Sequence, residues 1–122
     1  MSFFSGTVGS GIDFKATLAA GVTAAGIDYG LYNERPNEAM KDGLNHAGAN
    51  IVAQVTNIGQ FIPVPGELAS ISTDIAAGAA YCLINKFNTT SPFGENCLSN
   101  FLFGTANSIL SYNVTERVFT SI

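Results

Sequence analysis

The sequence predicts an all-α fold in which four helices form two helical hairpins, and three observations lead to this prediction. Four segments carry apolar and small residues at helical spacing and end at proline, glycine or asparagine. The block AAGIDYGLYN at 24–33 is matched by AAGAAYCLIN at 76–85, which suggests a duplicated hairpin, although alanine and glycine are common enough for a chance match. Charged residues make up only 11% of the chain, against about 25% in soluble domains, so much of the surface is expected to face lipid or other subunits.

A single domain is expected, because 122 residues can bury one core. A Gly- and Ser-rich arm at 1–12 precedes the first hairpin, residues 13–62. Its first helix is predicted over 13–32, beginning at a capping aspartate and ending before an asparagine and a proline. Residues 33–43 are rich in charge and contain that proline, which predicts a solvated connection. The second helix is predicted over 44–62.

The second hairpin is expected over 67–112, after a Pro- and Gly-rich turn. Its helices are predicted at 67–86 and 97–112. The last residues, 113–122, are expected to form an arm or a short strand. The stretch IVAQVTNIGQFIPV at 51–64 contains enough β-branched residues to be a pair of strands instead of a helix end.

The second and fourth helices carry polar faces made of amides rather than of charges. On the second helix, Asn50 and Asn57 lie opposite an apolar stripe, and Asn100 and Asn107 repeat this pattern on the fourth. We expect these four amides to bond to neighbouring subunits.

Small residues predict close helix packing. Gly26 and Gly30 form a GxxxG pair in the first repeated block, and Gly78 is the counterpart of Gly26 in the second. We expect these glycines to let another helix approach, so that a leucine at Gly26 or Gly78 would be overpacked.

Two aspartates, Asp28 and Asp74, lie inside otherwise apolar, small-residue helices. An ionised carboxylate away from water is costly, so an acid at such a position marks either a solvent or headgroup side, or a partner or aqueous path within a membrane. Cys82 and Cys97 bracket a turn-rich stretch and are either a disulfide or two free, buried cysteines.

Candidate catalytic and metal-binding residues are scarce. His46 is the single histidine, no GxSxG motif occurs, and a Cys2His metal site would lack close ligand spacing. His46 is therefore interpreted as a surface residue near a helix N-terminus. We expect no enzyme, no cofactor and no metal site.

The charge balance also excludes classes of partner. A net charge of −4 and five scattered basic residues argue against nucleic-acid binding. The N-terminus lacks the basic and apolar regions of a cleaved signal peptide, since its first basic residue is Lys15. The mean hydropathy of +0.27 lies between that of a soluble domain and that of a plain membrane protein.

These features together predict a non-enzymatic structural protein, oligomeric, and either associated with a lipid membrane or embedded in a large assembly. In overall character the chain resembles the small membrane-associated components of virus particles with an internal lipid layer, although no motif carries over a single residue. A pore-forming or holin-like channel is an alternative, with the amides lining water and Asp28 or Asp74 setting cation preference. A soluble helical binding module is a third.

Overall fold

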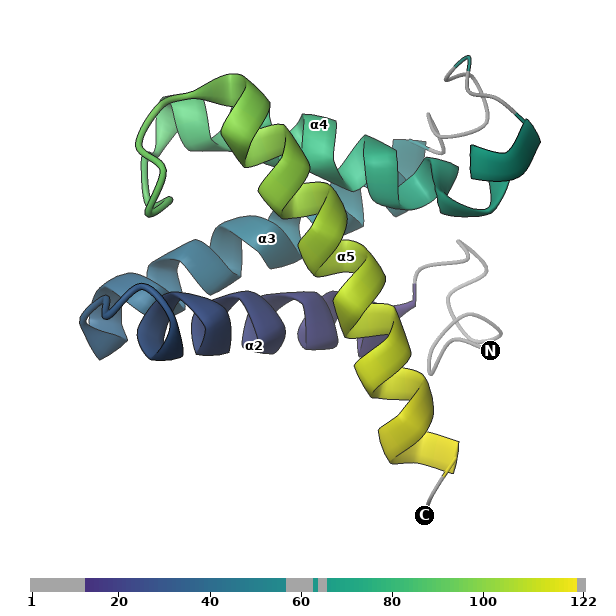
Figure 1. Ribbon diagram of the computed structural model, residues 1–122, viewed down its shortest axis with the longest axis horizontal. Helices are drawn as coiled ribbons and strands as arrows, with labels where there is room; N and C mark the ends of the chain where they lie inside the picture. Colours follow the sequence, from purple (N-terminus) through teal and green to yellow (C-terminus); the bar gives the residue numbers. More distant parts are fainter. Residues whose placement is uncertain (1–12, 57–62, 64–65, 121–122) are drawn as a thin grey trace.

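The computed structural model describes residues 13–56, 63 and 66–120 (Figure 1). Within these residues the chain is helical and contains no strand, which confirms the all-α prediction. There are four α-helices and one short 3-10 helix in the described part: α2 (Phe14–Gly30), α3 (Pro36–Thr56), η2 (Gly66–Ile71), α4 (Ser72–Phe87) and α5 (Cys97–Thr120).

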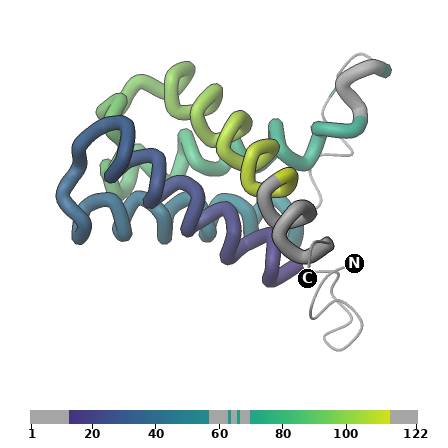
Figure 2. Tube along the Cα trace, turned by 60° about the horizontal axis from the view of Figure 1, so that its bottom comes forward, coloured from purple at the N-terminus to yellow at the C-terminus, as the bar shows by residue number. Residues whose placement is uncertain are grey.

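The helices pack as two pairs, α2 with α3 and α4 with α5, and the pairs lie against each other through α3 with α4 and α2 with α5 (Figure 1). Figure 2 shows α2 and α3 side by side, joined by a short loop. The loop between α4 and α5 lies at the same end of the bundle as this loop, because α2 and α4 both end there. We call this the loop end.

Two helix boundaries differ from the prediction at the first loop. Asp13 caps α2 as expected, and its side chain accepts a hydrogen bond from the backbone N–H of Ala16 at 3.0 Å. Pro36 does not act as a terminator but begins α3, so the expected solvated connection over 33–43 is helical from Pro36 onward. Proline suits the first helical position because its missing N–H has no intrahelical partner there.

The remaining boundaries shift as well. Helix α5 continues through residues 113–120, where an arm or a strand was predicted, and the predicted start of the third helix at 67 belongs to the 3-10 helix η2. The stretch 51–56 is helical, so the strand alternative is wrong there. The predicted arm at 1–12 and the predicted helix end at 57–62 lie outside the described residues.

Each helix pair crosses at a pair of glycines. A Cβ atom added to Gly43 would lie 2.6 Å from the carbonyl oxygen of Gly21, so the backbones of α3 and α2 meet there. A Cβ added to Gly104 would lie 2.9 Å from the Cα of Gly78, which places α5 against α4 in the same way. Packing through small residues therefore joins both hairpins.

The GxxxG pair of α2 does not take part in this contact. Gly26 and Gly30 are exposed, and a Cβ at either would meet no atom within 4 Å. The expected approach of a helix at Gly26 is corrected to Gly21, because α3 crosses α2 more than one turn earlier. Gly78, by contrast, lies at the α4–α5 crossing.

The matched blocks occupy different environments. A duplicated hairpin would give Tyr29 and Tyr81, which correspond in the two blocks, equivalent surroundings, but Tyr29 is 58% exposed whereas Tyr81 is fully buried. Ala24 and Ala76, which also correspond, are both fully buried. The matched blocks thus place a buried alanine at the same position in α2 and in α4, but the tyrosines that also correspond differ in burial.

The interior is made of alanine and polar side chains, while large apolar side chains lie outside. Buried apolar residues are mostly alanines. The polar residues buried with them are Thr17, Asp28, Asp42, Asn45, His46, Asn50, Asn85, Ser91, Asn100, Asn107, Ser108 and Ser111. On the second predicted helix the apolar stripe faces outward, with Leu44 71% exposed, and the amide face points inward.

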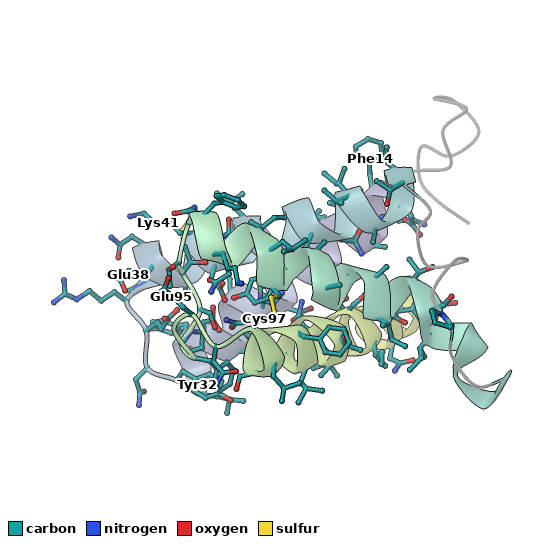
Figure 3. All side chains as sticks on the ribbon, turned by 90° about the horizontal axis from the view of Figure 1, so that it is seen from above. Phe14, Tyr32, Glu38, Lys41, Glu95 and Cys97 are labelled. Carbon is teal, nitrogen blue, oxygen red and sulfur yellow. A yellow bond between two sulfur atoms is a disulfide. The ribbon has the colours of Figure 1, made fainter. Side chains whose placement is uncertain are left out.

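Cys82 and Cys97 form a disulfide between α4 and the first residue of α5, 15 residues apart in sequence (Figure 3). Replacing both cysteines by alanine is expected to lower the free energy of unfolding by about 3 kcal/mol, because the open loop restores entropy to the unfolded chain. Urea unfolding of the oxidised protein, the reduced protein and the double variant measures this difference. Reduction should bring the wild-type protein close to the variant and leave the variant unchanged; a wild-type protein insensitive to reductant would contradict the prediction.

Candidate functional site

Ionisable side chains from three helices and one loop gather inside the loop end of the bundle. We call this group the acid cluster: Asp28 of α2, Glu34 of the α2–α3 loop, Asp42 and His46 of α3, and Tyr81 of α4. Asp42 and His46 share a face of α3, being one turn apart. Helix α3 presents this face to α4 and α2, which brings the cluster together.

Asp42 is the central acceptor of the cluster and is completely buried. Its Oδ1 accepts hydrogen bonds from the hydroxyl of Tyr81 and, at 2.7 Å, from the hydroxyl of Thr90. The Nε2 atom of His46 lies 3.4 Å from its Oδ2. Burial acts to raise the pKa of Asp42, but the contacts with His46 and Asp28 outweigh it and hold the pKa below its usual range.

The pKa of Asp28 shifts in the opposite direction from that of Asp42, although the two residues are neighbours. Its side chain is 0% exposed, and neither carboxyl oxygen has a hydrogen-bond partner among the described residues. Burial, and then the neighbouring carboxyl groups of Asp42 and Glu34, raise the pKa of Asp28 to about 10. The pKa of Glu34 is also raised, mainly by burial.

His46 lies in an aromatic setting and not on the surface. Its side chain is 3% exposed, and its ring stacks on Tyr81 with 3.7 Å between centroids and meets the edge of Phe103 at 4.7 Å. The expected surface position is corrected, because α3 begins at Pro36 and places His46 well inside the helix. Burial, followed by the charge of Asp42, raises the pKa of the Tyr81 hydroxyl, which therefore stays protonated and serves as a donor.

Amide side chains hold the α4–α5 loop over the cluster. The side-chain NH2 of Asn45 donates to the carbonyl of Asn88 and to the hydroxyl of Thr90, both at 2.8 Å. The side-chain oxygen of Asn85 accepts from the backbone N–H groups of Thr90 and Ser91. These bonds fix Thr90 where its hydroxyl reaches Asp42.

A polar hollow of about 240 Å³ lies outside the acid cluster, and we call it the loop-end hollow. It is lined by Glu34, Glu38, Lys41 and the residues 88–91. Figure 3 shows Glu38, Lys41, Glu95 and Tyr32 at this end of the bundle, with Phe14 at the opposite end. Glu34 and Thr90 border both the hollow and the buried aspartates.

A second polar hollow, of about 280 Å³, lies at the opposite end and includes Asp74, Asn50 and Gln54 in its lining. Asp74 accepts a hydrogen bond from Ser108, and burial raises its pKa. The two aspartates singled out in the sequence are thus at opposite ends and do not form one site.

The predicted amide contacts lie inside the chain. Asn50 accepts from the hydroxyl of Thr17 at 2.7 Å, Asn107 donates to the carbonyl of Ala20, and Asn100 donates to the carbonyl of Gly94. All three asparagines are buried, so these groups are directed to partners within the chain and not to neighbouring subunits. The fourth, Asn57, lies outside the described residues.

No protein-family model, curated protein or solved structure matches this chain. Across the described residues, no three or more His, Cys, Asp or Glu side chains are grouped so as to hold a metal ion. None of the described helices combines the length and the apolar character needed to cross a membrane.

Sequence reasoning missed Asp42, Glu34 and Tyr81 as members of a site. One signal was present, because Asp42 and His46 have the i, i+4 spacing that places two side chains on one helix face. Interpreting residues 33–43 as a connection hid that spacing, because the predicted helix then began at residue 44, between Asp42 and His46.

Proposed function

We propose that this chain is a non-enzymatic structural component of a larger assembly, with its apolar sides covered by neighbouring subunits or by lipid. One observation carries the proposal, namely the reversed distribution of polar and apolar side chains. Large apolar residues are exposed on all four α-helices, examples being Leu18, Val22, Met40, Leu44, Val55, Leu83, Phe87, Leu98 and Leu102. Exposed apolar surface of this extent is characteristic of a surface that is covered in the functional state.

The charges support the same interpretation. Between the two ends of the bundle the helices carry almost no ionisable side chains, and Asp, Glu, Lys and Arg are absent from residues 43–56, 75–85 and 96–115. On α2 the one charge-bearing residue within 16–31 is Asp28, which is buried. The bundle therefore has a belt without exposed charge, which water solvates poorly.

The position of this belt indicates how the sides are covered. A single partner protein would cover one face, but the exposed apolar residues lie on both helix pairs. Two apolar grooves occur on separate faces, one between α2 and α3 beside Leu18 and Met40, the other between α4 and α5 beside Leu83 and Leu98. Surroundings that enclose the bundle, as in a close-packed assembly such as a virus particle or at a lipid layer, fit this pattern.

The interior of a single bundle supports the channel alternative less well than it supports the structural role. The buried amides bond to partners within the chain, and Ala24, Ala49, Ala53 and Ala76 fill the centre at 0–1% exposure. A water path would thus have to form between several copies of the chain. Release of a trapped dye from liposomes tests this second proposal directly.

We expect the purified chain to be recovered without detergent as large oligomers or bound to lipid, and to become monodisperse in mild detergent. Light scattering after size-exclusion chromatography measures this, and carbonate washing of membranes separates adsorbed from embedded protein. The double variant Leu44→Gln, Leu83→Gln removes two exposed apolar side chains. It should shift the distribution of oligomers toward monomer without altering thermal stability.

A control for surface chemistry is Ala53→Gln, which adds the same amide group at a buried position. It should lower stability and leave the oligomer distribution of folded protein unchanged, because Ala53 is 1% exposed. A wild-type chain that is monomeric and soluble without detergent would overturn the proposal and favour the soluble binding module.

A further inference from the structure

We propose that Asp28 and Asp42 form a proton-binding site, in which two buried carboxyl groups hold one proton between them and take it from water in the loop-end hollow. This inference is independent of what covers the sides of the bundle. The ligand is the proton itself: a hydronium ion delivers it to a carboxylate oxygen of Asp28, an O–H bond forms and water is released.

Asp28 and Asp42 form a buried pair of carboxyl groups. Asp28 and Asp42 come from different helices, are both completely buried, and act directly on each other. Both oxygens of Asp28, together with Oδ2 of Asp42, have no hydrogen-bond partner among the described residues. Oδ2 of Asp42 has the imidazole of His46 beside it at 3.4 Å, whereas the two Asp28 oxygens have no such neighbour. Buried polar atoms are normally partnered, so a completely buried carboxyl group with two free oxygens, next to a second carboxyl group, indicates a missing positive charge.

A proton supplies the positive charge that this pair needs. Two carboxylates side by side in a low-dielectric interior cannot both remain ionised without a cation. The described residues place no group of three or more metal-ligating side chains together, whereas a proton can bind to a single carboxyl oxygen. The structure also decides which member stays ionised, because Asp42 accepts from Tyr81 and Thr90 while Asp28 accepts from neither.

The loop-end hollow gives the pair access to water. Glu34 lines the loop-end hollow, its backbone N–H donates to the carbonyl of Asp28 at 3.0 Å, and its Oε1 is buried without a partner. Thr90 lines the same hollow and donates to Asp42. Thr90 thus joins the hollow to the carboxylate of Asp42, and Glu34 joins it to the backbone of Asp28 and acts on the Asp28 carboxyl group through its charge, so the hollow is the route by which a proton would arrive from solvent.

The titratable groups around the site come from α2, the α2–α3 loop, α3 and α4. Helix α2 contributes Asp28, and its following loop Glu34; α3 contributes Asp42 and His46, with Glu38 and Lys41 lining the hollow; α4 contributes Tyr81. Helix α5 packs Phe103 there, which carries no charge. The charge of Asp42 raises the pKa of Asp28 most among the neighbouring charges, and the charge of Glu34 comes second.

The pair makes stability depend on pH in a definite direction. The pKa of Asp28 is raised from 3.8 to about 10, so its contribution is complete below pH 4 and is lost as pH rises toward 10. The pKa of Asp42 is lowered, so its contribution is present above pH 4 and is lost as the solution is acidified further. Between pH 4 and pH 10 the folded protein retains a proton that the unfolded chain has released.

The experiment uses ¹³C NMR of the intact protein labelled at aspartate, which gives four carboxyl signals, from Asp13, Asp28, Asp42 and Asp74. At pH 7 we expect one signal with the shift of a protonated acid, absent from Asp28→Asn. Four ionised signals in the wild-type protein at pH 7 would overturn the proposal, and this result needs no variant to fold. A shift of the Asp28 and Asp42 signals on adding Na⁺, Mg²⁺ or Ca²⁺ would also overturn it, because a metal ion would then take the place of the proton.

Two variants sharpen the assignment. Asn at position 28 imitates the protonated acid, so Asp28→Asn should reduce the slope of unfolding free energy against pH by about one proton between pH 4 and pH 10. Glu34→Gln removes a neighbouring negative charge and should move deprotonation of Asp28 to lower pH. Asp74→Asn, at the opposite end, is the matched control and should leave the Asp28 signal unchanged; an unchanged slope in Asp28→Asn would contradict the proposal.

Discussion

Replacing Asp42 by alanine is expected to lower the free energy of unfolding by about 3–5 kcal/mol, because one buried carboxylate serves several donors at once. The hydroxyl groups of Tyr81 and Thr90 both donate to it, and His46 lies against its other oxygen. Removing the acceptor leaves the buried Tyr81 hydroxyl and His46 without their partner, and the α4–α5 loop loses one of its bonds to α3, while the bond from Asn45 to Thr90 remains. Urea unfolding at pH 7 measures the change.

Tyr81→Phe is the matched control for this prediction. It keeps the ring that stacks on His46 and removes a single donor, so its cost should be smaller, about 1–2 kcal/mol. If Asp42→Ala were no more destabilising than Tyr81→Phe, the carboxylate would not be the centre of the network. A double variant should cost less than the sum of the two, because both changes remove the same bond.

Replacing Gly78 by leucine is expected to cost about 3 kcal/mol or more, since there is no room for a side chain where α4 crosses α5. Even a Cβ at this position would collide with the hydroxyl of Thr105 and the carbonyl oxygen of Phe101, and would lie 2.9 Å from the backbone nitrogen of Thr105. Two of these atoms are backbone atoms that cannot turn aside, so the helices must separate. Thermal unfolding followed by circular dichroism measures the loss.

Gly26→Leu is the control, chosen because Gly26 is the sequence counterpart of Gly78. A Cβ there meets nothing within 4 Å, and leucine favours helix more than glycine does, so stability should be unchanged or higher by about 0.5–1 kcal/mol. Equal losses in both variants would mean that the α4–α5 crossing does not lie at Gly78.

The comparison of these glycines shows how far the sequence could predict the fold. Helical spacing and turn residues located the helices, because both are local properties. The crossing point at Gly21 and Gly43 was not predictable. These glycines are 22 residues apart in the sequence, and their contact depends on how α2 and α3 meet in space. The GxxxG spacing of Gly26 and Gly30 identified a smooth helix face but not whether a helix lies on it.

The acid cluster shows a similar limit. Periodicity separated an amide face from an apolar face on α3, but it could not decide which one turns inward, and here the amide face does. Asp28 was recognised as unusual because it interrupts an apolar helix. Its neighbour Asp42 was not, because Pro36 was interpreted as the end of one helix when it begins the next.

The alanine-rich interior has a consequence for how the protein is made in the cell. Alanine gains little from leaving water, and amide and carboxyl groups are well hydrated in an unfolded chain, so folding in bulk water has a weak driving force. The same hydrogen bonds strengthen once water is excluded from the sides of the bundle. On our proposal that neighbouring subunits or lipid cover the sides of the bundle, a newly synthesised chain is expected to depend on a chaperone before it assembles, and to be degraded when it is produced in excess of those partners.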